Sequence, residues 1–413
     1  MSNRFAKGKV QKSNRVLFTL ACWGLRAACA LAGIRVVFSN KCGRLPEGPA
    51  IVLCNHGSFL DFAYTGTFLR KCRPNAVVAR YYFYHKWFSR LLKLLGCFPK
   101  SQLEVDVEST KNCLRVLKDG VLIMMPEARL CTVGRLEDIQ EGTYSFLKKM
   151  GVPVYSIRMN GDYFSKPKWG KGLRRGSLVE SELDVLFSSA DLERMSVEQI
   201  QQAVEERLRY DAFQWLQTRP EVHYRSNRLA EGLENILSIC PVCKGRHTIV
   251  TNKRDVFCEH CGKLTSLDSR YAFSQGFCFE NFVQWYDWQA AMLREEIVRD
   301  PAYTLQSAVE LQLSSEDGKT YTRSAGNGIC TLSREGLTYV GTKDGEAYAC
   351  SFTLKRIFRL IFDAGKGFQV HDGSELLYFV LDEGRSAVDW YVVSGLLYEE
   401  VCKKPLPPGA SIR

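Results

Sequence analysis

The sequence predicts three folded units: an α/β domain with a mostly parallel sheet and flanking helices, a small cysteine-containing unit, and a β-rich domain closed by a helix. Three observations carry this prediction. Strand-like and helical runs alternate between about residues 48 and 161, which is typical of a layered α/β core. Two Cys-x2-Cys pairs follow residue 239, and seven strand-like runs separated by turn residues fill most of the sequence after residue 300.

Composition and charge narrow the class of protein. A chain of 413 residues has room for two or three cores. With 46% hydrophobic and 24% charged residues it is neither a disordered chain nor a multi-span membrane protein as a whole. The net charge of +11 favours partners that carry phosphate, namely anionic lipid, phosphorylated substrate or nucleic acid. Most of the 16 cysteines stand singly in apolar runs and no signal peptide is convincing, so we expect an intracellular protein.

The first segment, residues 1–40, predicts a membrane-interface helix. An apolar run over 16–38 is interrupted by Arg26 and Arg35. A charge at mid-bilayer costs roughly 2.5 to 3.5 kcal/mol, so a helix lying in the interface is favoured over a single span or a plain buried helix. The basic residues before the run suit an anionic leaflet. We therefore expect a peripheral or monotopic protein on the cytoplasmic face of the membrane.

The α/β domain is expected over residues 41–232. Its strands are predicted at 50–54, 76–79, 120–125 and 152–158, and its helices at 61–71, 106–118, 141–150 and 196–210. A connecting helix is expected within 267–300. The β-rich domain at 301–404 has predicted strands at 308–313, 328–332, 336–340, 347–352, 357–362, 367–371 and 376–381 and a helix at 386–401. This layout resembles pleckstrin-homology-like or GRAM-like domains.

The segment Asn55-His56-Gly57-Ser58-Phe59-Leu60-Asp61 stands where a strand ends and a helix begins. If Asp61 lies in the first helical turn, its carboxylate can accept a hydrogen bond from His56 Nδ1 and leave Nε2 facing a cleft. Such a general base contributes roughly 10² to 10⁴ in rate, and attack of an alcohol on a thioester needs one. Backbone N–H groups at the helix start could stabilise the oxyanion. The alternative is a satisfied buried histidine beside an ordinary helix-start aspartate.

This segment closely resembles the Asn-His-x4-Asp first motif of the glycerolipid acyltransferase family. Residues 125–129, Met-Pro-Glu-Ala-Arg, resemble its third motif, usually Phe-Pro-Glu-Gly-Thr-Arg-Ser, and residues 151–154, Gly-Val-Pro-Val, resemble its fourth. The order and spacing agree over roughly residues 30 to 215. The resemblance implies an O-acyltransferase of the 1-acylglycerol-3-phosphate type in phospholipid biosynthesis, with His56 as base and Asp61 as its partner. The acyl donor would be acyl-CoA or acyl carrier protein.

The resemblance also implies where the acceptor binds. Glu127 would support acceptor binding, Arg129 would contact its phosphate, and Asn55 and Ser58 would help to bind substrate. The second motif, residues 96–102, has Gln102 where the family has arginine, which leaves Lys100 as the nearest cation. Lysine cannot grip phosphate in a planar fork, and the third motif has Ala128 in place of glycine and its arginine one place early. These departures leave the precise acceptor open. Lysophosphatidate is the leading acceptor that the resemblance implies, and a lysophospholipid with another headgroup is the alternative.

One further basic segment could meet the phosphates of lipid or coenzyme A, or could be a solvated loop. Its cations are Lys166, Lys168, Lys171, Arg174 and Arg175.

Four cysteines predict a structural zinc ribbon at 238–266. Cys240, Cys243, Cys258 and Cys261 form two Cys-x2-Cys knuckles, and four thiolates at this spacing can surround zinc tetrahedrally with no open position. Zinc ribbons also bind nucleic acid, so the alternative is a non-catalytic lipid-binding scaffold or regulator whose ribbon binds nucleic acid or protein. The retained His56 and Asp61 make nucleic acid an unlikely partner. The β-rich domain could recruit the protein to lipid or protein partners.

Overall fold

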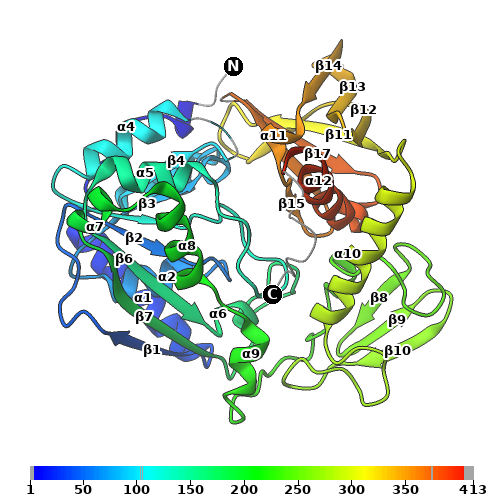
Figure 1. The fold of residues 1–413 in the computed structure, drawn as a ribbon, viewed down its shortest axis with the longest axis horizontal. Coiled ribbons are helices and arrows are strands. Elements are labelled where there is room, and N and C mark those ends of the chain that lie inside the picture. Colours follow the sequence, from blue (N-terminus) through cyan, green and yellow to red (C-terminus); the bar gives the residue numbers. More distant parts are fainter. Residues whose placement is uncertain (1–3, 103, 105, 374, 404–413) are drawn as a thin grey trace.

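The computed structural model describes residues 4–102, 104, 106–373 and 375–403 (Figure 1). Residues 1–3 of the expected interface segment and residue 404 of the expected β-rich domain lie outside the described residues. In Figure 1 the α/β domain forms one lobe, and the β-rich domain with the small cysteine-containing unit forms the other.

The α/β domain is built on a seven-stranded sheet in the order β1-β7-β6-β2-β5-β3-β4. Five of its six strand pairings are parallel and only β6 with β7 is antiparallel, so the predicted mostly parallel sheet is confirmed. The central strand β2 is buried at all five positions, as an apolar strand covered on both faces should be. The strands are β1 Arg35–Asn40, β2 Ala50–Cys54, β3 Asn75–Ala79, β4 Cys97–Lys100, β5 Val121–Met124, β6 Val154–Asn160 and β7 Leu178–Phe187.

Helices cover both faces of this sheet (Figure 1). Alternate residues of β2 enter two different cores: Val52 packs in the cluster that includes Tyr64 of α2, and Leu53 packs in the cluster that includes Leu147 of α5. The helices are α1 Arg15–Leu31, α2 Asp61–Phe68, α3 Lys86–Leu94, α4 Val107–Val116, α5 Gly142–Met150, α6 Asp162–Ser165, α7 Ser189–Arg194, α8 Val197–Leu208 and α9 Ala212–Gln217, with 3-10 turns η1 Arg4–Ala6 and η2 Arg80–Phe83.

The N-terminal segment differs from the prediction. The helix expected over the apolar run ends at Leu31, and the rest of the run forms β1, which pairs with β7 inside the sheet. Gly33, with a φ of +67°, permits the turn between them, and the Val-Val-Phe run after it favours a strand. The α/β domain therefore begins at Arg35 and not at residue 41. None of the described helices combines the length and hydropathy that a membrane crossing requires.

The second lobe contains two further sheets. The cysteine-containing unit has three antiparallel strands, β8 Ile249–Asn252, β9 Asp255–Cys258 and β10 Gly262–Ser266, preceded by η3 Leu233–Asn235 and followed by α10 Phe282–Arg299. The β-rich domain has seven antiparallel strands in the order β14-β13-β12-β11-β17-β16-β15. They are β11 Leu305–Ser314, β12 Thr322–Ser333, β13 Gly336–Lys343, β14 Glu346–Phe352, β15 Ile361–Asp363, β16 Gly367–Asp372 and β17 Glu375–Leu381, closed by η4 Gly384–Ser386 and α12 Ala387–Cys402.

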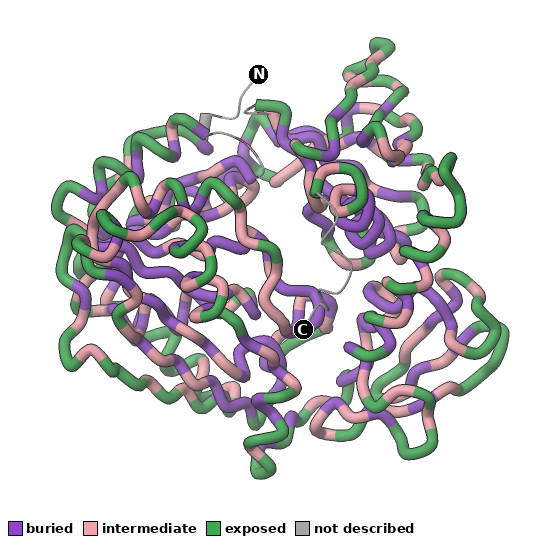
Figure 2. Tube along the Cα trace, in the orientation of Figure 1, coloured by how far each residue is buried: buried purple, intermediate pink, exposed green. Residues whose placement is uncertain are grey.

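The predicted seven strands and closing helix are present in the β-rich domain, with one local difference. The strand expected at 357–362 is instead a helical turn, α11 Leu354–Ile357, followed by the short β15. Ile357 and Leu360 of that run are fully buried outside any strand, whereas Ile361 and Phe362 pair with β16. Figure 2 shows α12 almost wholly buried along its first three turns, as its apolar sequence requires.

The β-rich domain packs directly against the α/β domain. Leu376 and Tyr378 of β17 belong to the same apolar cluster as Phe83 and Tyr84 of the α/β domain. An ion pair between Arg356 and Glu104 joins the two domains nearby. An open cleft of about 1600 Å³ also lies between the lobes and is lined from both sides. The two domains therefore share buried surface.

Candidate active site

Three neighbouring parallel strands deliver the candidate site residues to one edge of the sheet. β6, β2 and β5 lie side by side, and the chain leaves their carboxyl ends at Asp162, His56 and Glu127 respectively. Carboxyl ends of neighbouring parallel strands meet at the same edge, where α/β proteins place their ligand sites. Residues more than 100 positions apart are brought together in this way.

His56 and Asp61 make the predicted contact. His56 Nδ1 lies 3.0 Å from Asp61 Oδ2, and Asp61 is the first residue of α2. Asp61 is fully buried, whereas 15% of the His56 side chain is exposed. With Nδ1–H donating to the carboxylate, Nε2 of the neutral ring is left with a free lone pair.

The pKa of His56 is lowered to about 4, chiefly by burial; Asp162 opposes this effect and the charge of Lys168 adds to it. The ring is therefore neutral at neutral pH. A neutral ring can accept a proton at Nε2, which is the state that a general base needs.

The N–H groups expected to stabilise an oxyanion are already engaged. Asp61 Oδ2 accepts the N–H of Ser58 at 2.9 Å, and the N–H of Leu60 donates to Ser58 Oγ at 3.3 Å. The N–H of His56 donates to Glu127 Oε1 at 2.7 Å. The expected oxyanion donors at this helix start are corrected for these three groups, because two of them hold carboxylates and the third holds the Ser58 hydroxyl.

Glu127 is fully buried and ties two loops together. Its Oε1 accepts the N–H of His56 and its Oε2 accepts the N–H of Glu137 at 2.8 Å. Burial raises the pKa of Glu127 well above its ordinary value, and the two N–H groups oppose this effect. In this structure Glu127 thus supports the backbone that carries His56 and presents no free oxygen to an acceptor.

Arg129 lies beside His56's loop but is covered by the β-rich domain. Its Nε donates to the carbonyl of Glu127 at 3.3 Å and its Nη1 to the carbonyl of Arg359 at 3.2 Å, with the guanidinium 4.8 Å from the Phe358 ring centroid. Only 4% of the residue is exposed, and Nη2 has no hydrogen bond among the described residues. Arg129 is therefore a buried cation with unused donor capacity.

Asn55 and Ser58 do not face substrate here. Asn55 Nδ2 donates to the carbonyl of Met159 at 2.9 Å, and its Oδ1 accepts the N–H of Met159 at 2.7 Å, which joins the end of β2 to β6. Ser58 Oγ contacts the carbonyl of Lys166 at 3.4 Å. Both side chains are fully buried. In this structure their polar groups bond within the protein and shape the loop, and their predicted contact with substrate stays a prediction.

Lys100 and Gln102 are not brought to His56. β4 lies at the far edge of the sheet, three strands from β2, which is about 14 Å at normal strand spacing. Lys100 Nζ donates to the carbonyl of Glu104 at 3.3 Å, and Gln102 Nε2 donates to the carbonyl of Ala128. Gln102 therefore supports the third-motif loop, and Lys100 has no contact with the histidine pair.

Lys168 was expected only as part of a basic segment, and nothing in the sequence placed it near His56. Its charge lowers the pKa of His56, and its Nζ lies 3.7 Å from the Phe362 ring centroid of the β-rich domain. Burial lowers the pKa of Lys168 itself to about 8. Arg174 of the same basic segment is fully buried and bonds to Tyr271 and to backbone carbonyls, so it is not a lipid contact.

Asp162 is the site residue that the sequence did not reveal. It follows β6 and Gly161, and its carboxyl group lies within hydrogen-bond reach of Asp61. Parallel pairing of β6 with β2 was the only signal that could have pointed to it, because no motif was assigned to this position.

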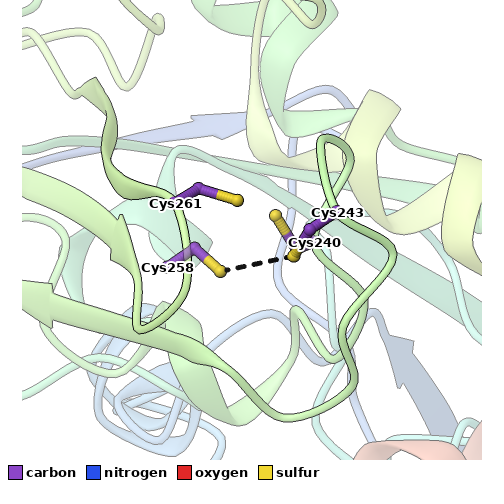
Figure 3. Close-up of side chains that lie close together, drawn as sticks. All are labelled: Cys240, Cys243, Cys258 and Cys261. Carbon is purple, nitrogen blue, oxygen red and sulfur yellow. Dashed lines mark hydrogen bonds between the residues drawn. The ribbon is translucent and has the colours of Figure 1, made fainter.

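Four sulfur atoms form a second candidate site in the other lobe. The Sγ atoms of Cys240, Cys243, Cys258 and Cys261 lie within 4.8 Å of one another and point toward a common centre (Figure 3). The separation of 3.7 Å between Cys243 and Cys258 matches the roughly 3.8 Å expected for a tetrahedron with Zn–S bonds of about 2.3 Å. The four thiols therefore have the number, chemistry and spacing that a zinc ion requires.

The fold and the histidine pair define an α/β domain with a candidate site at one edge of its sheet, and comparison with known proteins shows which family this domain resembles. Residues 35–160 match the family model described as Acyltransferase, which confirms the resemblance of the motifs to an acyltransferase family for this segment. No curated protein matches the chain. Among solved structures it is similar to the 1-acyl-sn-glycerophosphate (LPA) acyltransferase PlsC from Thermotoga maritima, with 19% identity, a TM-score of 0.38, and coverage of 46% of this chain and 76% of that chain.

Proposed function

We propose that the protein transfers a fatty acyl group from acyl-CoA or acyl carrier protein to the hydroxyl of a lysophosphatidate-like acceptor. The single observation that carries the proposal is the neutral His56 paired with buried Asp61 at the sheet edge of an acyltransferase-family domain. Acyl transfer to an alcohol needs a base of this kind.

The chemistry follows from the position of His56. Nε2 accepts the proton of the acceptor hydroxyl while its oxygen attacks the thioester carbonyl carbon. The tetrahedral intermediate then collapses as the carbon–sulfur bond breaks. The departing thiolate takes the proton back from the imidazolium, leaving an ester and a free thiol. Asp61 stabilises the imidazolium through the 3.0 Å contact to Nδ1.

We propose that Arg129 and Lys168 bind the acceptor's phosphate. Each charge lies close enough to the other that Arg129 lowers the pKa of Lys168, so an anion between them would relieve unfavourable repulsion. Arg129 also retains an unbonded Nη2 for such a ligand. Phosphate binding requires Arg129 to exchange its contacts with Phe358 and Arg359 for the ligand, because both residues now cover it.

An acyl-acceptor panel tests the proposal. Purified protein is given radiolabelled acyl-CoA or acyl carrier protein with lysophosphatidate and with lysophospholipids of other headgroups. His56→Ala should reduce transfer at least a thousandfold, and His223→Ala, which removes an exposed histidine bonded only to Ser269, should not. Equal activity of wild type and His56→Ala on every acceptor would reject His56 as the base.

A non-catalytic lipid-binding scaffold is a second candidate, favoured by the cover over Arg129. In that case the wild-type protein would bind lysophosphatidate-containing vesicles and turn over none of the acceptors. Measured turnover that depends on His56 would eliminate this candidate. Nucleic acid is not part of either proposal.

We further propose that the four-cysteine site holds a structural zinc ion and that α1 attaches the protein to an anionic membrane surface at the cytoplasmic face. Zinc would link the two knuckles of a unit whose three short strands build little core of their own. α1 presents exposed apolar side chains at three- and four-residue spacing, Val16, Leu20 and Trp23, as an interfacial helix does.

A further inference from the structure

A second carboxyl group lies directly behind the His56–Asp61 pair. Asp162 stands at the start of α6, where the chain leaves β6, and it is fully buried. Its carboxyl group is within hydrogen-bond reach of that of Asp61. Asp61 thus contacts His56 with one oxygen and lies beside Asp162, and both carboxyl groups are fully buried.

The loop that carries His56 is shaped to admit Asp162. A Cβ atom on Gly57 would lie 2.1 Å from Asp162 Oδ2, a distance at which two heavy atoms overlap. Gly57 has no positive φ, so backbone freedom does not explain a glycine there. The absence of a side chain at residue 57 is what allows the two carboxyl groups to meet beneath the loop.

Two touching carboxyl groups in a buried site cannot both be ionised, because neither solvent nor a cation offsets their repulsion. The donors around them identify the charged member. Asp61 Oδ2 accepts the N–H of Ser58 and contacts Nδ1 of His56. Asp61 Oδ1 and both oxygens of Asp162 have no donor of normal geometry among the described residues.

A proton on Asp162 supplies the missing hydrogen-bond donor. Its O–H then donates to Asp61 Oδ1, which otherwise has no partner, and the Asp61 carboxylate is held from both sides. Burial raises the pKa of both carboxyl groups, that of Asp61 to about 8 and that of Asp162 well above its ordinary value. The Ser58 N–H and the Asp162 side chain oppose the effect at Asp61, whereas Asp61 adds to it at Asp162, so Asp61 is the more easily ionised of the two.

We propose that Asp162 is a protonated positioning residue, whose O–H fixes the Asp61 carboxylate so that its other oxygen holds His56 in the tautomer with Nε2 free. The expected effect on kcat rests on the proposed function, whereas the proton on Asp162 and its hydrogen bond to Asp61 do not. Asp162 lies two residues beyond the segment that matches the family model.

Two substitutions distinguish Asp162 acting as a hydrogen-bond donor from Asp162 acting as a negative charge. Asp162→Asn replaces the O–H with an N–H donor of nearly the same shape, whereas Asp162→Ala removes the donor. We expect Asp162→Asn to keep kcat within about threefold of wild type. Asp162→Ala should lose at least tenfold in kcat with KM nearly unchanged, because the fault lies in the base and not in binding. Asp382→Asn, which removes an exposed carboxyl group, serves as the control.

Infrared spectroscopy of the resting protein tests the proton directly. Wild type at neutral pH should show the carbonyl band of a protonated carboxyl group that is missing from Asp162→Asn and present in Asp382→Asn. This reading needs no substrate, so it stands even if every acceptor in the panel fails and the proposed function falls. Thermal melting of each variant shows whether it folds.

The proposal is overturned by any of three results. One is the absence of the band in folded wild type. Another is loss of activity in folded Asp162→Asn equal to that in Asp162→Ala, which would mean that Asp162 works as an anion. The third is full activity in Asp162→Ala.

Discussion

At the scale of single residues, the contacts around His56 hold its imidazole in one position. It is hydrogen-bonded to a buried carboxylate, and its own backbone N–H is held by Glu127. Both contacts reduce the freedom of the ring. The position of His56 therefore depends on Asp61 and Glu127.

The depressed pKa of His56 predicts the acid limb of the pH–rate profile. Because burial lowers the pKa to about 4, the base stays deprotonated well below the ordinary value of 6.5. We expect kcat/KM to remain nearly constant as the pH falls from 7 to 5.5 and to decrease only as it approaches 4. Steady-state assays across this range test the expectation, and a half-maximal point near 6.5 would contradict it.

Ala128 predicts a stabilising substitution. Its φ is +54°, in the left-handed region where a Cβ costs about 1 to 2 kcal/mol. Ala128→Gly removes that strain and adds some entropy to the unfolded chain, so we expect a net gain of about 0.5 to 1 kcal/mol. Urea unfolding measures it, with Ala190→Gly inside α7 as the control that should lose stability.

At the scale of elements, the knuckles flanking β9 and the helix α1 each carry a prediction. Cys240→Ser removes one of four thiols, so zinc measured in the purified protein should fall from about one equivalent to near zero. Melting should drop by several degrees, since metal binding contributes folding free energy. Cys278→Ser, an exposed cysteine outside the cluster, should retain the metal. Equal zinc content in both variants would refute the site.

The exposed face of α1 predicts weaker membrane binding when it is made polar. Leu20 and Trp23 are 61% and 59% exposed, so changing both to serine removes apolar surface without opening the core. We expect binding to anionic vesicles to weaken at least tenfold in flotation assays, because each buried apolar side chain contributes about 1.5 to 3 kcal/mol. Val298→Ser, on the exposed side of α10, should bind as wild type. Unchanged binding by the double variant would count against an interfacial helix.

At the scale of the whole molecule, the two lobes are joined by a common core. Leu376 of β17 is fully buried among residues of the α/β domain, so Leu376→Ala should cost about 2 to 5 kcal/mol. The truncated side chain would leave a cavity between the two domains. In Leu376→Ala, amides of β2 and of β17 should therefore lose hydrogen-exchange protection together. Loss of protection in β17 alone would show that the domains unfold independently.

Local patterns were sufficient for much of the fold. A short continuous apolar run predicted β2 within its observed bounds, and turn residues marked six of the seven strands in the β-rich domain. The pattern failed at β1, where an apolar run contained both a helix and a strand, and at α11, where buried apolar residues have no strand partner. In both places the spacing of apolar residues did not show the secondary structure, because residues of different elements are buried side by side in the sequence.

The sequence by itself determined the contacts between residues that lie a few positions apart. His56 and Asp61 meet because five residues span the turn from a strand end into a helix, and the four cysteines meet because each pair closes its own knuckle. Only the tertiary structure decided that Asp162 lies against Asp61 and that Arg359 covers Arg129, 230 residues away in sequence. Those contacts depend on strand order and domain docking, which arise from burial of whole surfaces and leave no periodic trace in the chain.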